Sequence, residues 1–255
     1  MLLAVDVGNT NLTVGAFAGE RLVRTWRLET DPRRSAEWYA RALKCPFRKL
    51  AALPEAVVYG SVVPPLDATL EAAILKAFGV KPLAVTPRSK LGLKLRVRTP
   101  NQVGADRVLN AVALKSLART PAIAIDFGTA TTFDCVDASG DYVGGAILLG
   151  PNSAARALHE FTAKLPLVKL RKPATAIGKD TVHCLEAGLY FGYLGMIREV
   201  LARTKAELGG RPAVVATGGL APLFLADLKG VRHEPDLTLH GLRVAHDMLT
   251  TGVNR

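Results

Sequence analysis

Two stretches of the sequence match each other, LLAVDVGNT at Leu2–Thr10 and AIAIDFGTA at Ala122–Ala130. Each has four apolar residues, an aspartate, one apolar residue, a glycine and a pair of small residues. Such an apolar run ending in Asp-x-Gly is typical of a buried strand followed by a tight turn. The aspartates Asp6 and Asp126 lie 120 residues apart in the numbering, which is the spacing of repeated domains rather than of a solenoid. The sequence therefore predicts two copies of one β-rich unit, residues 1–119 and 120–255.

Strands and helices alternate around both stretches, which predicts mixed α/β layers. In the first half, further strands are expected at 12–17, 22–28, 56–63 and 82–85, and helices at 35–44, 66–78 and 105–118. In the second half, the strands are expected at 130–136, 142–148 and 213–216, and the helices at 151–161, 181–208 and 240–249. A polar, basic loop at 86–103 is long for a connection, and loops of that length are more often functional than decorative.

The composition is that of a folded globular protein. The 255 residues are 49% hydrophobic and 22% charged, which excludes a disordered chain. The cysteines Cys45, Cys135 and Cys184 form no CxxC pair and have no zinc-ligand spacing, so we expect three reduced thiols. No apolar stretch reaches membrane-spanning length and the chain opens without a leader pattern. We therefore expect an unexported, cytoplasmic protein with no membrane partner.

The formal net charge of +11 is the unusual feature of the composition. Such a charge suits either a nucleic-acid partner or an anionic small substrate. The basic residues are spread along the chain, and no zinc-finger or RNA-recognition signature accompanies them. The pattern therefore favours a solvated basic surface and disfavours a nucleic-acid partner.

The two Asp-x-Gly turns carry the first chemical prediction. Each places a carboxylate at a strand end, followed by a glycine that lets the backbone approach a ligand closely. One such hairpin alone is as well explained as a plain turn. Two matched copies facing a shared cleft would converge on a metal–triphosphate, where the carboxylates hold cations. A third glycine turn, Thr217–Gly219, follows an apolar strand and would let a base or ribose lie against the backbone, although a lone TGG is weak evidence.

A fourth candidate lies at Gly104–Arg107, where the long basic loop turns into a helix. A helix start offers free N–H groups to an anion, Arg107 offers a planar donor fork, and Asp106 offers a base. The alternative is an N-terminal cap with a surface ion pair. The residues alone leave these two interpretations open.

Taken in order, the motifs resemble the type III pantothenate kinases over nearly the whole chain. Seven ordered motifs are far more specific than any one of them; they are DVGNT at Asp6–Thr10, PNQVGADR at Pro100–Arg107, DFGTATTFD at Asp126–Asp134, GGAILLG at Gly144–Gly150, TAKLP at Thr162–Pro166, GKDT at Gly178–Thr181 and TGG at Thr217–Gly219.

The resemblance implies a fold, an activity and an assembly. The fold would be that of the actin-like acetate and sugar kinases, with two ribonuclease-H-like lobes and a nucleotide cleft between them. The activity would be ATP-dependent phosphorylation of pantothenate to 4′-phosphopantothenate, the first step of coenzyme A biosynthesis. The assembly would be a homodimer whose active site draws on both subunits.

The resemblance also assigns roles to residues of this chain. Asp106 would accept the proton, Asp126 would hold a monovalent cation such as K⁺ or NH₄⁺, and Asp6 would lie near Mg²⁺. ATP would be bound by Asp6, Val7, Gly8, Asn9, Thr10, Asn11, Leu12, Thr13, Thr129, Gly218 and Gly219. Pantothenate would be bound by Gly104, Ala105, Asp106, Arg107 and Thr181.

The sequence departs from the family pattern at two positions. Leu149 stands where members usually have proline, and Val97 stands where many carry a tyrosine that lines the substrate pocket. These departures affect the expected shape of the loop and the pocket rather than the aspartates.

Two other functions remain open at this point. One is a non-catalytic regulatory homologue linked to transcription, against which the presence of Asp6, Asp106, Arg107 and Asp126 argues. The other is a kinase or phosphatase of the same fold acting on another small molecule, because a fold does not choose the acceptor. The GADR and GKDT motifs favour pantothenate by resemblance only.

Overall fold

The structure is a computed structural model that describes residues 1–49, 53–118 and 120–252. The chain divides into two compact units. The first comprises Met1–Ser116 together with Leu237 and the residues after it, and the second comprises Leu117–Asp236. The positions of the two units relative to each other are not defined, so each is described by itself.

A five-stranded sheet forms the centre of the first unit, in the order β3-β2-β1-β4-β5. Its strands are β1 (Leu2–Val7), β2 (Asn11–Ala18), β3 (Arg21–Glu29), β4 (Ala56–Ser61) and β5 (Leu83–Val85). The first three strands form an antiparallel meander, because tight turns join them, whereas β4 runs parallel to β1 and β5 parallel to β4. The central strand β1 is therefore covered on both edges.

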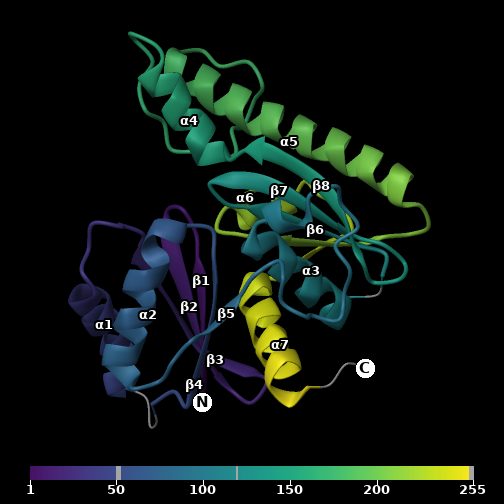
Figure 1. The fold of residues 1–255 in the computed structure, drawn as a ribbon. Helices are drawn as coiled ribbons and strands as arrows, with labels where there is room; N and C mark the ends of the chain where they lie inside the picture. The colour runs from purple at the N-terminus through teal and green to yellow at the C-terminus, as the bar shows by residue number, and fades with distance from the viewer. Residues whose placement is uncertain (50–52, 119, 253–255) are drawn as a thin grey trace. The chain divides into compact units, whose positions relative to one another are not determined.

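Helices cover both faces of this sheet (Figure 1). Two of them, α1 (Ala36–Lys44) and α2 (Pro64–Phe78), pack on the face that carries Leu3, Val5 and Val7. The other two, α3 (Ala105–Leu117) and α7 (Leu237–Thr251), pack on the face that carries Ala4 and Val58. The expected signals delimit these helices: the Ser35 hydroxyl caps α1, prolines begin α2, and Gly79 ends it in the left-handed region at φ 70°.

The second unit has its own five-stranded sheet, in the order β10-β9-β6-β7-β8. Its strands are β6 (Ala122–Phe127), β7 (Ala130–Val136), β8 (Tyr142–Leu149), β9 (Ala213–Thr217) and β10 (Val231–His233), and its helices are α4 (Pro151–Glu160), α5 (Thr181–Leu208) and α6 (Ala221–Leu225). The long helix α5, green in Figure 1, packs through Tyr190, Tyr193 and Ile197 on the face of the sheet that carries Ile123, Ile125 and Phe127.

The two sheets have the same topology. Read from the opposite edge, the second is β8-β7-β6-β9-β10, which corresponds strand for strand to β3-β2-β1-β4-β5, with the same parallel and antiparallel pairings. The α/β fold of two duplicated lobes that the sequence predicts is therefore confirmed.

The second unit begins at Leu117, three residues before the expected position, and α7 belongs to the first unit rather than the second. Gly241 lets the backbone of α7 lie directly against the carbonyl of Leu109 on α3, where any side chain would collide. At the same crossing, the buried Thr238 hydroxyl donates to Oδ1 of the buried Asn110 at 2.9 Å. The end of the chain thus completes the first core.

Two further observations bear on the sequence predictions. The three cysteines are free thiols. Within the described part of the chain, no helix combines the length and the apolar character needed to cross a membrane.

Candidate functional site

The first predicted turn closes β1 onto β2. Asp6, at the end of β1, is half-buried and lies opposite Thr13 of β2 and Gly60 of β4. The Gly8 N–H donates to the Asn11 carbonyl at 3.1 Å. Asn9 and Thr10, at the tip of the turn, are exposed. The turn therefore presents backbone to solvent beside a carboxylate, as a phosphate-binding turn requires.

Thr30, which directly follows β3, holds this turn from the side. Its hydroxyl donates to the Gly8 carbonyl at 2.6 Å, and its backbone N–H donates to the Thr10 carbonyl at 3.0 Å. The sequence analysis did not single out Thr30, because nothing local in the sequence shows a hydrogen bond across 22 residues.

The start of α3 packs directly onto the end of β4. A Cβ at Gly60 would lie 2.6 Å from Cδ1 of Leu109 and 3.5 Å from Cβ of Ala105, so the helix start lies directly against the strand here. Asp6 lies opposite Gly60 and, by strand alternation, on the same face as Ala4, which is the face that α3 covers.

Gly104 brings the predicted substrate residues to the same place. A Cβ at Gly104 would lie 3.4 Å from Cγ1 of Val62, and the Val62 N–H donates to the Val7 carbonyl at 3.0 Å. The Gly104–Arg107 segment therefore lies beside the end of β1, next to the first turn. Within this unit, the structure brings together the predicted nucleotide and substrate residues.

Asp106 has the environment of a general base. Its side chain is half-buried, and its Oδ1 accepts the Arg107 N–H at 2.8 Å. A Cβ at Gly104 would collide with the same oxygen, so the carboxylate lies directly over the glycine. Burial raises the pKa of Asp106 above its ordinary value, while the hydrogen bond from the Arg107 backbone and the Arg107 charge oppose this rise. A carboxylate with a raised pKa is a stronger base than an exposed aspartate.

The second unit repeats the Asp-x-Gly arrangement with a different neighbour. Asp126, at the end of β6, lies opposite Thr132 of β7 and Thr217 of β9. Gly218 follows β9 with φ 87°, and a Cβ there would lie 2.6 Å from Asp126 Oδ1 and 2.6 Å from the Phe127 nitrogen. The backbone of the Thr217–Gly219 turn therefore contacts the Asp126 carboxylate, which only glycine permits.

The start of α4 holds the second turn, Gly128–Thr129. The Gly150 N–H and the Ser153 hydroxyl both donate to the Thr129 carbonyl, at 2.9 and 2.8 Å. A Cβ at Gly150 would collide with the Gly128 and Thr129 carbonyls, so the turn lies on bare backbone. Leu149, where family members usually have proline, is 57% exposed, and the Gly150 N–H makes its hydrogen bond without that proline.

Comparison with known proteins agrees with this geometry. The family model described as "Type III pantothenate kinase" matches residues 2–203. A type III pantothenate kinase of Geobacter sulfurreducens is 45% identical over 97% of this chain and 98% of the relative, and one of Moorella thermoacetica is 44% identical over 98% of this chain and 100% of the relative. The chain belongs to the type III pantothenate kinase family.

Solved structures show the same fold at low sequence identity. A Campylobacter jejuni protein named for the Baf family of transcriptional activators has a TM-score of 0.63 at 16% identity, covering 98% of this chain and 100% of that chain. The activator of 2-hydroxyisocaproyl-CoA dehydratase from Clostridium difficile, solved with bound ADPNP, has a TM-score of 0.54 at 11% identity, covering 98% of this chain and 96% of that chain. These two proteins therefore share the fold of this chain.

Thr181, the remaining substrate residue predicted from the family pattern, is the first residue of α5 and is exposed. The Asp180 carboxylate caps this helix by accepting the His183 N–H at 2.9 Å and lies 2.6 Å from His183 Nδ1. Gly178 lies directly against the backbone of His183 and Cys184. The GKDT motif is therefore the start of α5, and a contact of Thr181 with pantothenate stays a prediction.

The family implies Mg²⁺ and a monovalent cation, and the side-chain oxygens of the site show which residues could hold them. Among the described residues, no group of three or more His, Cys, Asp or Glu side chains is placed to hold a metal ion. Mg²⁺ in kinases commonly takes one or two carboxylates, with phosphate and water completing its shell, so Asp6 alone fits. The Asp126 carboxylate, which lies beside the backbone of Gly218, would supply the oxygen donor for a monovalent cation.

A cavity of about 360 Å³ lies elsewhere in the second unit, between α5 and the segment from Asp227 to Val231. Its lining includes Arg198, Lys205 and Lys229. None of the residues predicted for the kinase site lines it, so it is separate from both turns.

Proposed function

We propose that this protein transfers the γ-phosphoryl group of ATP to the primary hydroxyl of pantothenate in the cytoplasm, giving 4′-phosphopantothenate. One observation supports this most directly: the start of α3 packs against Gly60 and Val62, beside the end of β1. In this proposal Asp106 is the base, Arg107 binds the anionic end of the substrate, and the turn after β1 binds the phosphates, an arrangement that phosphoryl transfer to an alcohol requires.

In this proposal the nucleotide is bound by glycine-rich turns. Residues Asp6–Thr13 contact the phosphates in the first unit, while Thr129, Gly218 and Gly219 contact the nucleotide in the second. Mg²⁺ near Asp6 and K⁺ or NH₄⁺ near Asp126 would offset charge on the transferring group when bound. The glycines are essential because they let backbone N–H groups approach the phosphate oxygens without an intervening Cβ.

Pantothenate is bound at the start of α3. Arg107 pairs with the carboxylate of pantothenate through its planar fork, and the backbone of Gly104 and Ala105 provides close contact at the helix start. Asp106 orients the attacking hydroxyl and accepts its proton late in the transition state, because the transition state of phosphoryl transfer is loose. Thr181 completes the substrate pocket.

We further propose that two copies of the chain pair through the outer face of α5. Gly188, Gly192 and Gly195 lie on this face, and a Cβ at any of them would meet nothing within 4 Å. Phe191 and Met196 lie on the same face and are 37% and 43% exposed. A glycine inside a helix costs about 1 kcal/mol relative to alanine, and a second helix approaching closely would explain three of them. Such a dimer fits the expectation of an active site that draws on both subunits.

The dimer is tested by sedimentation of the wild type and of Gly192→Arg. We expect a dimer for the wild type and a folded monomer for the variant, because an arginine would separate the helices. A matched Ala138→Arg variant, at an exposed site in the turn between β7 and β8, should remain dimeric. A wild type that is monomeric at micromolar concentration would contradict this assembly.

The reaction is tested by incubating the protein with ATP, Mg²⁺, K⁺ and pantothenate and identifying the product by mass. We expect 4′-phosphopantothenate and a stoichiometric amount of ADP. A folded protein that binds ATP but yields no product would overturn the acceptor, and other small alcohols would then be screened. Binding of DNA that weakens steeply with salt, without any kinase activity, would favour the regulatory alternative.

A further inference from the structure

The segment after β3 supports the first turn in a way that the proposed function does not use. Thr30 donates two hydrogen bonds to that turn, from its hydroxyl to the Gly8 carbonyl at 2.6 Å and from its N–H to the Thr10 carbonyl at 3.0 Å. Both acceptors belong to the turn proposed to contact the phosphates. The bonds therefore fix the orientation of peptide groups at the ligand site itself.

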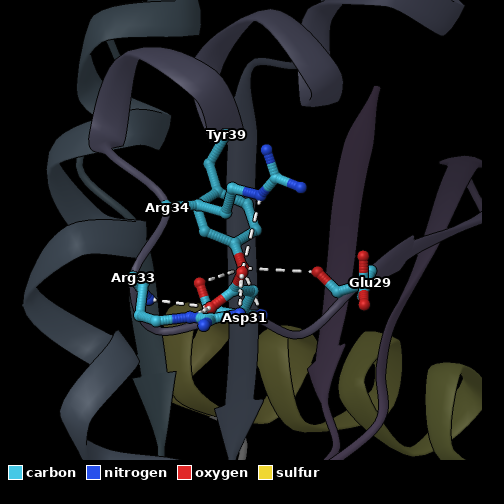
Figure 2. Close-up of polar contacts among 5 residues, drawn as sticks. All are labelled: Glu29, Asp31, Arg33, Arg34 and Tyr39. Carbon is cyan, nitrogen blue, oxygen red and sulfur yellow. Dashed lines mark hydrogen bonds and ion pairs between the residues drawn. The ribbon is translucent and has the colours of Figure 1, made fainter.

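Tyr39 of α1 holds this segment in place. Its ring is fully buried, and its hydroxyl oxygen accepts the Asp31 N–H at 3.0 Å. The same hydroxyl has two carbonyl acceptors for its proton, that of Asp31 at 3.2 Å and that of Glu29 at 3.3 Å. Figure 2 shows the Tyr39 hydroxyl lying between Glu29 and Asp31, the residues on either side of Thr30. A helix in the core is thus tied to both neighbours of Thr30.

The Asp31 side chain fixes the other side of the segment (Figure 2). Its oxygens accept from Arg33 Nε at 2.8 Å and from Arg33 Nη2 at 3.1 Å, and Arg34 Nε lies 3.6 Å away. The Arg33 hydrogen bonds hold the pKa of Asp31 below its ordinary value, so the carboxylate stays charged at neutral pH. The Arg33 side chain is 90% exposed, so we assign this pair a local role in the shape of the segment.

We infer that Thr30, Asp31 and Tyr39 form a turn brace that positions the first turn for the triphosphate, with Thr30 as the positioning residue. In a trans peptide the C=O and the following N–H point in opposite directions. A Gly8 carbonyl directed at Thr30 therefore directs the Asn9 N–H away from Thr30, toward the exposed side of the turn. The Thr30 hydrogen bonds also keep two carbonyl oxygens from facing the negative phosphates.

This inference rests on the proposed nucleotide role of the Asp6–Thr13 turn, but not on the identity of the acceptor. The sharpest test measures binding of Mg²⁺–ADPNP by calorimetry, without pantothenate. We expect Thr30→Val to raise the Kd about fivefold to tenfold, because it keeps the shape of the side chain and removes one hydrogen bond. Thr30→Ser keeps the hydroxyl and should stay within about twofold of the wild type.

Two further variants separate positioning from stability. Thr25→Val makes the same substitution at an exposed site on β3 and should leave the Kd unchanged. Tyr39→Phe removes only the hydroxyl that holds Asp31 and should raise the Kd about twofold to threefold. In the kinase assay, Thr30→Val should raise the KM for ATP by the same factor as the Kd, with kcat and the KM for pantothenate nearly unchanged.

The outcomes are distinct. Equal Kd values for the wild type and a folded Thr30→Val would overturn the inference, and if that variant does not fold, an unchanged Kd for Tyr39→Phe would do so. A wild type that does not bind ADPNP would overturn both this inference and the proposed function. A wild type that binds ADPNP, loses affinity in Thr30→Val, and does not phosphorylate pantothenate would support the brace and reject only the acceptor.

Discussion

The two Asp-x-Gly turns have the same strand frame but different supports. In the first unit, the hydroxyl and the backbone N–H of Thr30, after β3, donate to two different carbonyls of the turn after Asp6, and α3 brings Asp106 beside it. In the second, the Gly150 N–H and the Ser153 hydroxyl, at the start of α4, both donate to one carbonyl of the turn after Asp126, and the neighbour is the bare Gly218. The duplication therefore supplies two similar carboxylate positions, and the elements packed against them decide which chemistry each serves.

The largest effect should come from Asp106→Asn, which removes the proposed base from the first unit. We expect kcat to fall about 10²-fold to 10⁴-fold, measured by release of 4′-phosphopantothenate.

Stability provides the control for this variant. Burial raises the pKa of Asp106, so the folded state favours the protonated form, and stability is lost as pH rises through the unfolded and then the folded pKa. Above the folded pKa the buried carboxylate is charged, so its replacement by a neutral asparagine should not lower the midpoint of thermal unfolding. The exposed Asp247→Asn should leave kcat unchanged. An unchanged kcat of Asp106→Asn would show that Asp106 is not the base, so the first turn would not differ from the second by having a catalytic neighbour.

The next largest effect should come from Gly218→Ala in the second unit. The left-handed φ of 87° and the 2.6 Å approach to Asp126 Oδ1 both oppose a Cβ, and together they should lower the free energy of unfolding by about 2–4 kcal/mol. Gly19→Ala, at φ 60° with nothing within 4 Å, should cost only about 1 kcal/mol. Denaturant titration gives the free energy of unfolding of both variants, and their difference measures the clash at Gly218. Equal losses of free energy would show that a Cβ at Gly218 does not clash with Asp126.

A moderate effect should appear in the pH dependence of kcat/KM. Because an active base must be deprotonated, kcat/KM should fall on the acid side with a midpoint above the ordinary aspartate pKa, in the direction that burial shifts Asp106. Arg107→Met removes a charge that opposes this shift, so the acid limb should move to higher pH, in addition to the loss of substrate binding. If the acid limb of Arg107→Met stays at the same pH, the Arg107 charge does not affect the pKa of the catalytic base.

The smallest effect should come from Ser153→Ala. Its hydroxyl donates to the Thr129 carbonyl at 2.8 Å, but the Gly150 N–H donates to the same oxygen. With one donor left, we expect the KM for ATP to rise less than about threefold. A rise comparable to that of Thr30→Val would show that the second turn depends on its hydroxyl as much as the first turn does, although a second donor remains.

The sequence predicts the elements of this fold well where local signals delimit them. The helix expected at 181–208 has those bounds, because the Asp180 side chain caps its start and Gly209, in the left-handed region at φ 70°, ends it. The strand β10 was missed, since Val231–His233 is a short edge strand with two polar residues and no apolar run. The 3₁₀ segment Cys45–Lys49 was also missed.

The site was less predictable, because it depends on packing between distant segments. The aspartates and glycines were found because their motifs are local. The close approach of α3 to β4 depends on Gly60, an ordinary strand glycine in the sequence. The helix at 240–249 was expected, but its packing in the first unit and the role of Thr30 were not, because these are contacts across more than 100 and 22 residues.

The return of α7 to the first unit has a consequence for the order of synthesis. The second unit, Leu117–Asp236, is continuous, whereas the first lacks Leu239, Leu242 and Ala245 of its core until α7, which follows the second unit in the sequence, leaves the ribosome. Domains generally fold as units during translation. The half that is made first, with the proposed base and phosphate turn, is therefore the half that matures last, and nascent chains lacking α7 would display its unfinished apolar face to the cell's chaperones.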